Sequence, residues 1–178
     1  PPHDIFLKPN WSNNFMLLYS FSKVFRLTGH RVGAVVTSTK RMQEIEKFLD
    51  TSTICPNQIG QHAALFGLKK LSYWVQEQRL DLLKRRESLE RGFEDLESDG
   101  WVLRGLGAYF AYLEYPFTIS SRELSKRLLE EKGILTVPGA LFSNKTEAAA
   151  NRFLRVAFAN ISLDDIQILF QRLKSFKL

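Results

Sequence analysis

A long helical pattern divides this 178-residue chain and limits the folds that it can adopt. From Tyr73 to about Glu97 the sequence is rich in Glu, Arg, Leu and Lys, and Asp99-Gly100 ends the pattern. At 1.5 Å per residue such a helix would span roughly 38 Å. A helix of that length, polar on one side, is typical of a connection between domains. We therefore expect a first domain over 1–72, an interdomain helix over 73–98 and a small domain over 99–178.

The part before the long helix alternates between strand and helix patterns. Residues 14–22 form a continuous apolar run that ends in serines, and 32–37 form a second strand-like run. Helices are predicted around 42–49 and again up to about Leu71, with a loop over 51–57 between them. Continuous apolar runs are typical of strands buried on both faces of a parallel sheet. The sequence thus predicts an α/β fold that begins with an incomplete parallel sheet.

The part after the long helix has the order strand, strand, helix, strand, strand, helix. Strands are predicted at 101–103, 109–113, 134–137 and 153–158, and the pairs Ser120/Glu123 and Ser162/Asp165 mark the helix starts. This order indicates a small α+β layer domain.

Composition excludes several classes of protein and site. The net charge of +6 comes from basic residues dispersed along helical patterns with acidic neighbours, so we expect no nucleic-acid partner. No run approaches the roughly 18 apolar residues of a membrane span, and no secretory leader is visible. The single Cys55 cannot form an internal disulfide, and no histidine has a ligand-spaced partner. We expect a cytoplasmic protein without a membrane partner or a metal site.

One lysine lies in a setting suited to an anionic carbonyl compound. Lys23 follows Ser20 and Ser22, and Arg31 comes eight residues later between Gly29 and Gly33. A lysine amine condenses with a carbonyl to give a Schiff base. The planar fork of an arginine binds phosphate through two hydrogen bonds, and serine hydroxyls donate to the same oxygens. An isolated pair of this kind would more often be a solvated lysine and an ion-paired arginine.

The whole run S-F-S-K-V-F-R-L-T-G-H-R-V-G resembles the cofactor-lysine segment of the class I/II, fold-type I aminotransferases. These enzymes use pyridoxal 5′-phosphate. The resemblance implies that Lys23 is the catalytic Schiff-base lysine and that Ser20, Ser22 and Arg31 bind the cofactor phosphate.

A second candidate residue is Arg155, in the middle of an alternating strand with Phe153 and Ala157 on its own face. A buried arginine needs an anion, which an internal salt bridge also supplies unless the side chain reaches water. The segment from Pro138-Gly139 to Phe142, followed by R-x-x-x-A, resembles the small domain of the same family. That likeness implies that Arg155 binds the α-carboxylate of the substrate.

The resemblance runs from about residue 14 to the end and covers about the C-terminal half of a family member. It implies the C-terminal portion of a homodimeric aminotransferase that moves an amino group from an α-amino acid to a 2-oxo acid. The loop over 51–57 would lie near the partner's cofactor, and the residues that contact the cofactor ring would lie before residue 1. Three alternatives remain: an aminotransferase-like sensor domain of a transcription regulator, a lyase or synthase of the same fold, or a degenerate fragment that only mediates interactions.

Overall fold

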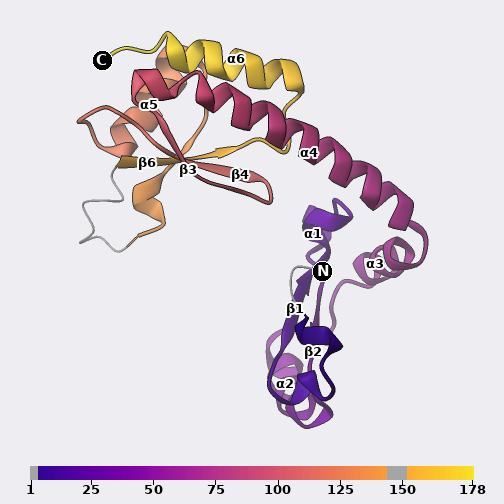
Figure 1. Ribbon diagram of the computed structural model, residues 1–178. Coiled ribbons are helices and arrows are strands. Elements are labelled where there is room, and N and C mark those ends of the chain that lie inside the picture. Colours follow the sequence, from indigo (N-terminus) through magenta and orange to yellow (C-terminus); the bar gives the residue numbers. More distant parts are fainter. Residues whose placement is uncertain (1–3, 144–151) are drawn as a thin grey trace. The chain divides into compact units, whose positions relative to one another are not determined.

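The computed structural model describes residues 4–143 and 152–178 (Figure 1). The chain divides into two compact units, the first ending at Glu77 and the second beginning at Gln78. Helix α4 spans Ser72–Glu94, close to the long helix that the sequence predicts, and it contains this division. In the part of the chain that the structure describes, no helix has the length and apolar character needed to cross a membrane.

The first unit combines short helices, two strands and two longer helices. In chain order they are η1 (Ile5–Leu7), η2 (Trp11–Asn13), β1 (Leu17–Ser20), α1 (Phe21–Val24), η3 (Thr28–His30), β2 (Gly33–Val36), α2 (Thr39–Ser52) and α3 (Gln58–Lys70). Its core of buried apolar side chains is small and consists of Phe21, Val32 and Ala64.

The prediction of a parallel sheet in this unit is wrong. Strands β1 and β2 pair in antiparallel fashion, with Leu17 opposite Val36 and Ser20 opposite Gly33. The strand is not buried on both faces either, because Leu18 is 71% exposed. A parallel pair needs a crossover that carries the chain back along the sheet, usually a full helix. Here only α1 and η3 lie between the strands, so the chain turns back directly, and an apolar run does not distinguish the two arrangements.

The loop predicted over 51–57 is shorter than expected, because α2 continues to Ser52. The hydroxyls of Thr51 and Ser52 each donate to the Phe48 carbonyl oxygen at 2.9 Å. Serine and threonine hydroxyls within a helix commonly bond in this way to a carbonyl one turn earlier. Asn57 then caps α3 by accepting the Gly60 N–H at 2.7 Å.

The second unit is a four-stranded antiparallel sheet with helices beside it. After α4 come η4 (Glu97–Asp99), β3 (Val102–Gly107), β4 (Phe110–Glu114), α5 (Ser121–Lys132), β5 (Val137–Pro138), η5 (Gly139–Leu141), β6 (Phe153–Ala157) and α6 (Leu163–Lys174). The strand order is β3-β4-β6-β5, so β6 lies between β4 and β5. The whole chain is therefore a mixed α/β protein with antiparallel sheets.

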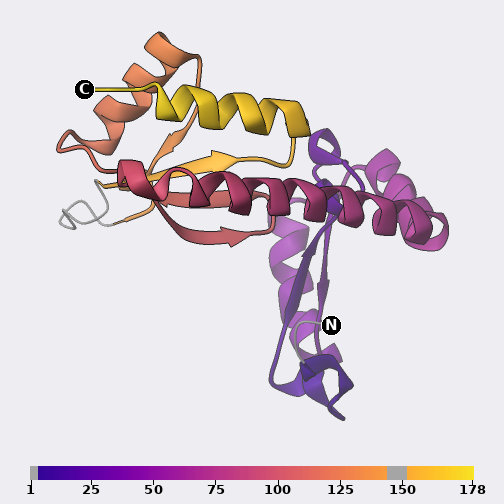
Figure 2. The ribbon, with the colours of Figure 1, turned by 45° about the horizontal axis from the view of Figure 1, so that its top comes forward.

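The two faces of this sheet differ sharply. Helices α5, α6 and the adjoining part of α4 gather on one side of the sheet, whereas η5 lies on the other (Figures 1 and 2). The helix-covered face carries core residues of β4 and β6, namely Ala111, Leu113, Leu154 and Val156. Because side chains alternate along a strand, the opposite face carries Phe110, Tyr112, Glu114, Phe153 and Arg155.

The helix ends of this unit follow the predicted caps. The Ser162 hydroxyl accepts the Asp165 N–H and the Asp165 carboxylate accepts the Ser162 N–H, which completes a capping box. Ser120 caps α5 in the same way by accepting the Glu123 N–H at 3.2 Å. Gly133 ends that helix in the left-handed conformation, with φ at 62°.

Candidate functional site

Lys23 lies in a single helical turn that begins directly after β1. The Ser20 hydroxyl caps this turn by accepting the Ser22 N–H at 3.3 Å. Phe21 and Ser22 are buried, whereas Lys23 is exposed. The buried residues anchor the turn and leave the amine of Lys23 accessible.

The side chain of Arg31 contacts the same turn. Its backbone is left-handed, with φ at 50°, a conformation that costs energy for a residue other than glycine. Its Nη1 donates to the Thr28 carbonyl at 3.0 Å and to Ser22 Oγ at 3.5 Å. The structure thus brings Ser20, Ser22 and Arg31 together beside Lys23.

These groups suit a phosphate. The Ser20 and Ser22 hydroxyls both act as acceptors, one from a backbone N–H and the other from Arg31. Each hydroxyl keeps its own proton to donate, and within the described residues neither proton has an acceptor. Two free O–H donors beside a guanidinium match the oxygens of a phosphate monoester, so the residues present fit the phosphate end of pyridoxal 5′-phosphate.

Helix α3 supports this turn, a feature that the sequence analysis missed. A Cβ atom built on Gly67 would lie 2.7 Å from the Phe25 ring, and one on Gly60 would lie 3.2 Å from His30 Cβ. Gly60, Ala64 and Gly67 are the buried residues of α3, and their spacing places them on one face of the helix. The signal was visible in the sequence as small residues at helical spacing, but nothing there identified what lies against them.

Arg155 belongs to β6 in the second unit and contacts two phenyl rings. Its Cζ lies 4.3 Å from the centre of the Phe110 ring and 4.7 Å from that of Phe142. Its buried Nε has no hydrogen-bond partner among the residues that the structure describes. Among residues 4–143 and 152–178, no carboxylate forms an ion pair with Arg155. A buried donor without a partner is unusual among protein polar groups.

Other side chains on this face do not provide that anion. Glu114 lies further along β4, where it pairs with Arg104 at 2.6 Å and Arg152 at 3.5 Å. Tyr112 lies directly opposite Arg155, and burial raises its pKa above the ordinary value. Tyr112 therefore stays neutral at physiological pH. Phe153 stacks on Tyr112 with ring centres 5.1 Å apart, so the face is largely aromatic around Arg155.

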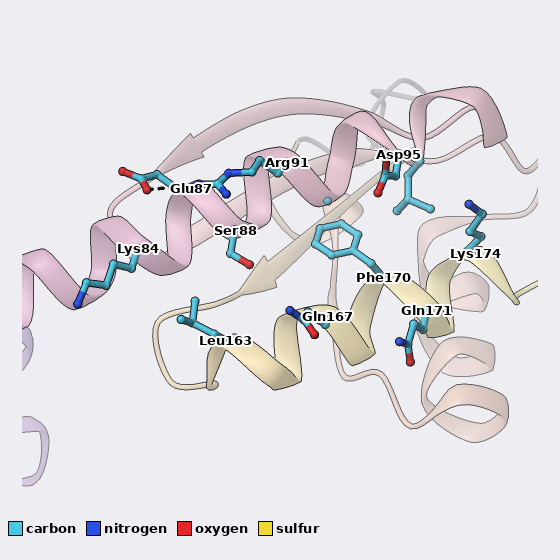
Figure 3. A pocket seen from close by; sticks show the side chains of 12 residues that line it. Lys84, Glu87, Ser88, Arg91, Asp95, Leu163, Gln167, Phe170, Gln171 and Lys174 are labelled. Atoms are coloured by element: carbon cyan, nitrogen blue, oxygen red, sulfur yellow. Dashed lines mark ion pairs between the residues drawn. The ribbon is translucent and has the colours of Figure 1, made fainter.

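A separate hollow of about 670 Å³ lies between α4 and α6. Figure 3 shows Phe170 reaching from α6 toward α4, with charges of both signs around it. Lys84, Arg91 and Lys174 line the hollow together with Glu87 and Asp95, and Glu87 pairs with Arg91 at 3.6 Å. None of the predicted site residues lines this hollow. In the described part of the chain, no three His, Cys, Asp or Glu residues are grouped to hold a metal ion.

Comparisons with known proteins match most of the chain to one family. A sequence model of the family described as aminotransferase class I and II matches residues 6–173. The aspartate aminotransferase of Sulfurisphaera tokodaii is 27% identical, and the match covers 94% of this chain and 42% of that protein. An aminotransferase structure from Staphylococcus aureus has a TM-score of 0.78 at 25% identity, covering 92% of this chain and 42% of that one.

A second solved structure, an aminotransferase from Mycobacterium tuberculosis, has a TM-score of 0.77 at 26% identity over 90% of this chain and 41% of that one. This chain thus spans about two fifths of the length of the relatives that it matches. Because the family's model matches nearly all of the sequence, the chain belongs to the aminotransferase class I and II family.

Proposed function

We propose that the protein containing this chain is a pyridoxal-phosphate-dependent aminotransferase that moves an amino group from an α-amino acid to a 2-oxo acid. The observation that carries the proposal is the group of free hydroxyl donors and one guanidinium beside an exposed lysine. Relatives named as aspartate aminotransferases support the reaction class. Because the chain spans only about two fifths of their length, the activity is assigned to the intact natural protein.

Three residues would hold the cofactor phosphate and one would hold its aldehyde. Ser20 and Ser22 donate their hydroxyl protons to the phosphate, and Arg31 neutralises its charge. Lys23 attaches the cofactor through its amine. The bound cofactor supplies an electron sink for a negative charge on the amino acid's α-carbon.

Lys23 has a second role in the proposal, as the base that takes and returns the α-proton of the amino acid. Its exposed position in the α1 turn leaves the amine able to move between two partners. Arg155 binds the α-carboxylate through two parallel N–H donors, which fixes the amino acid's orientation. The buried, unpartnered Nε and the lack of an ion-paired carboxylate in the described residues support this role.

The organisation of the intact protein is part of the proposal. We assign residues 1–72 to a cofactor-binding domain, 73–98 to the helix that joins the domains, and 99–178 to the small domain. We further propose that the protein acts as a cytoplasmic homodimer, with the loop near residues 51–57 close to the partner's cofactor.

The first experiment locates the lysine that bears the cofactor. The intact natural protein is incubated with pyridoxal 5′-phosphate, reduced with borohydride, digested and analysed by mass spectrometry. We expect the pyridoxyl label on the peptide containing Lys23 and its loss in Lys23→Ala. Lys40→Ala is the matched control, because Lys40 is exposed at the start of α2, away from the turn. A label that persists in Lys23→Ala contradicts the proposal.

The same preparation tests the reaction class. The unaltered protein is offered each of the twenty amino acids with a 2-oxo acid acceptor, and both products are measured. We expect a new amino acid to form from the acceptor in equal amount to the donor consumed. Consumption of the donor without amino transfer to the acceptor counts against an aminotransferase.

A further inference from the structure

We infer that Phe110 and Phe142 are positioning residues that hold the Arg155 guanidinium between them and leave its N–H edge open for a carboxylate. The inference rests on the proposed role of Arg155 and adds how this side chain is kept in place. Neither ring is a catalytic residue, because each acts through Arg155.

The contacts come from both sides of the strand that carries Arg155. Phe110 lies on β4 and Phe142 directly follows η5, which continues β5; β4 and β5 are the two neighbours of β6. Both ring centres lie within 5 Å of the guanidinium carbon. Cation–π attraction extends to about 6 Å, so both rings attract the charge. The guanidinium is therefore restrained by two rings, one from each side of β6.

The guanidinium is restrained by rings and not by an ion pair. An ion pair within the protein would occupy the N–H donors that a substrate carboxylate needs. A carboxylate binds guanidinium along its edge, through the N–H donors. A ring face instead attracts the positive charge without accepting those in-plane hydrogen bonds. Glu114, on the same face, is held by Arg104 and Arg152. Within the described part of the chain, the Arg155 guanidinium is thus held by the rings while its N–H donors have no protein acceptor.

The Phe142 ring sits on a well-supported turn. The Phe142 N–H donates to the Gly139 carbonyl at 2.9 Å. The Ala140 N–H donates at 3.3 Å to the hydroxyl of Ser121, a residue that is fully buried at the start of α5. Helix α5 therefore fixes the turn that presents the ring, so the ring position follows from the fold of the second unit.

The test separates binding from turnover in the intact natural protein. The probe is the amino acid that the unaltered protein converts fastest among the twenty. For Phe142→Leu, and for the double variant with Phe110→Leu, we expect KM to rise about 10-fold while kcat stays within about twofold. Phe142→Tyr keeps an aromatic face and is expected to retain the original KM. Phe142→Met, which keeps bulk without a ring, is a second test should the leucine variants fold poorly.

Phe153→Leu is the matched control. It lies on the same sheet face and stacks on Tyr112 rather than on Arg155. We expect its KM to stay within about twofold of the original. An unchanged KM in the double variant, or an equal rise in Phe153→Leu, overturns the inference.

Arg155→Ala distinguishes this inference from the proposed function. If Arg155→Ala raises KM strongly while the double leucine variant does not, the role of the rings is wrong and the role of Arg155 stands. If Arg155→Ala leaves KM unchanged, Arg155 does not bind the carboxylate and both statements fail. If both raise KM, both are supported. Melting temperatures of all variants confirm that each is folded.

Discussion

Tyr115 shows how burial changes the chemistry of a single side chain in this protein. The residue is fully buried at the end of β4, and its hydroxyl donates to the Ile119 carbonyl at 2.9 Å. Burial raises the pKa of Tyr115 to about 12, with the nearby charge of Arg152 acting in the opposite direction. Removing the phenol proton inside the core leaves a charge that the surroundings do not solvate.

This pKa shift predicts a loss of stability in alkali. Near pH 10 the unfolded chain loses the Tyr115 proton, whereas the folded chain keeps it to about pH 12. The unfolded state then binds fewer protons, so the free energy of unfolding falls between about pH 10 and pH 12. The fall is at most ~1.4 kcal/mol per pH unit. Urea titrations across that range measure it.

Tyr115→Phe is the comparison for this measurement. The variant lacks the hydrogen bond to Ile119 and is expected to be less stable at neutral pH by about 1 kcal/mol. Its stability should decline less steeply above pH 10, because the titrating group is gone. Parallel curves for the two proteins would show that Tyr115 does not titrate with a raised pKa.

At the scale of elements, the packing of α3 under the Lys23 turn is the feature most open to test. Gly67 lies against the flat side of the Phe25 ring, and Phe25 stacks on Phe21 with ring centres 6.0 Å apart. Phe21 is the first residue of the turn that carries Lys23. A shift of the Phe25 ring therefore reaches the candidate cofactor site through one intermediate contact.

We predict that Gly67→Ala destabilises the protein by about 1 kcal/mol. Alanine gains ~0.5–1 kcal/mol over glycine within a helix, but the added methyl overpacks against the ring at a cost of ~1–3 kcal/mol. Gly29→Ala is the control, since nothing lies within 4 Å of its added Cβ. Urea unfolding of the intact protein measures both. Stabilisation by Gly67→Ala would mean that the ring moves aside without cost.

Some segments of the fold can be predicted from neighbouring residues in the sequence. Other segments depend on contacts with residues far away in the sequence. The caps at Ser120 and Ser162 and the stop at Gly133 were predicted, because each is settled within a few residues. The antiparallel pairing of β1 with β2 was not, because an apolar run carries no information about strand direction. The candidate phosphate-binding residues could also be proposed from local sequence, since Ser20 and Arg31 lie in one continuous motif.

Across the whole molecule, the two units differ greatly in the core that supports them. The first unit buries the side chains of Phe21, Val32 and Ala64, whereas the second buries a cluster drawn from α4, α5, α6 and the sheet. Burial of apolar surface is the main source of stability, so local stability should differ as well.

Hydrogen exchange of the chain described here tests this difference. We expect amides of β1 and β2 to exchange at least about 100-fold faster than those of β4 and β6, because ~25 cal/mol is gained per Å² of apolar surface buried. Because both sheets belong to one chain, the amides of each sheet serve as the internal reference for those of the other. Similar protection in both sheets would show that the first unit is stabilised by something other than its own core.

The surroundings of Arg155 illustrate what only the complete fold provides. Its place in the middle of a strand was predicted, and so was its need for an anion. The rings of Phe110 and Phe142 were not, because their contact depends on the register of β4 against β6 and on the turn after β5. That turn is itself fixed by Ser121 of α5. Such an arrangement requires every neighbouring element to be in place.

The absence of an ion-paired carboxylate around Arg155 in the described residues has a consequence for the solution around the protein. Aromatic rings attract a guanidinium without neutralising its charge, so small anions of the medium are attracted to it as well. If Arg155 binds the α-carboxylate of the substrate as proposed, chloride, acetate and other small anions compete with it for the same N–H donors. In that case the affinity measured for a carboxylate substrate depends on the kind and concentration of salt in the buffer.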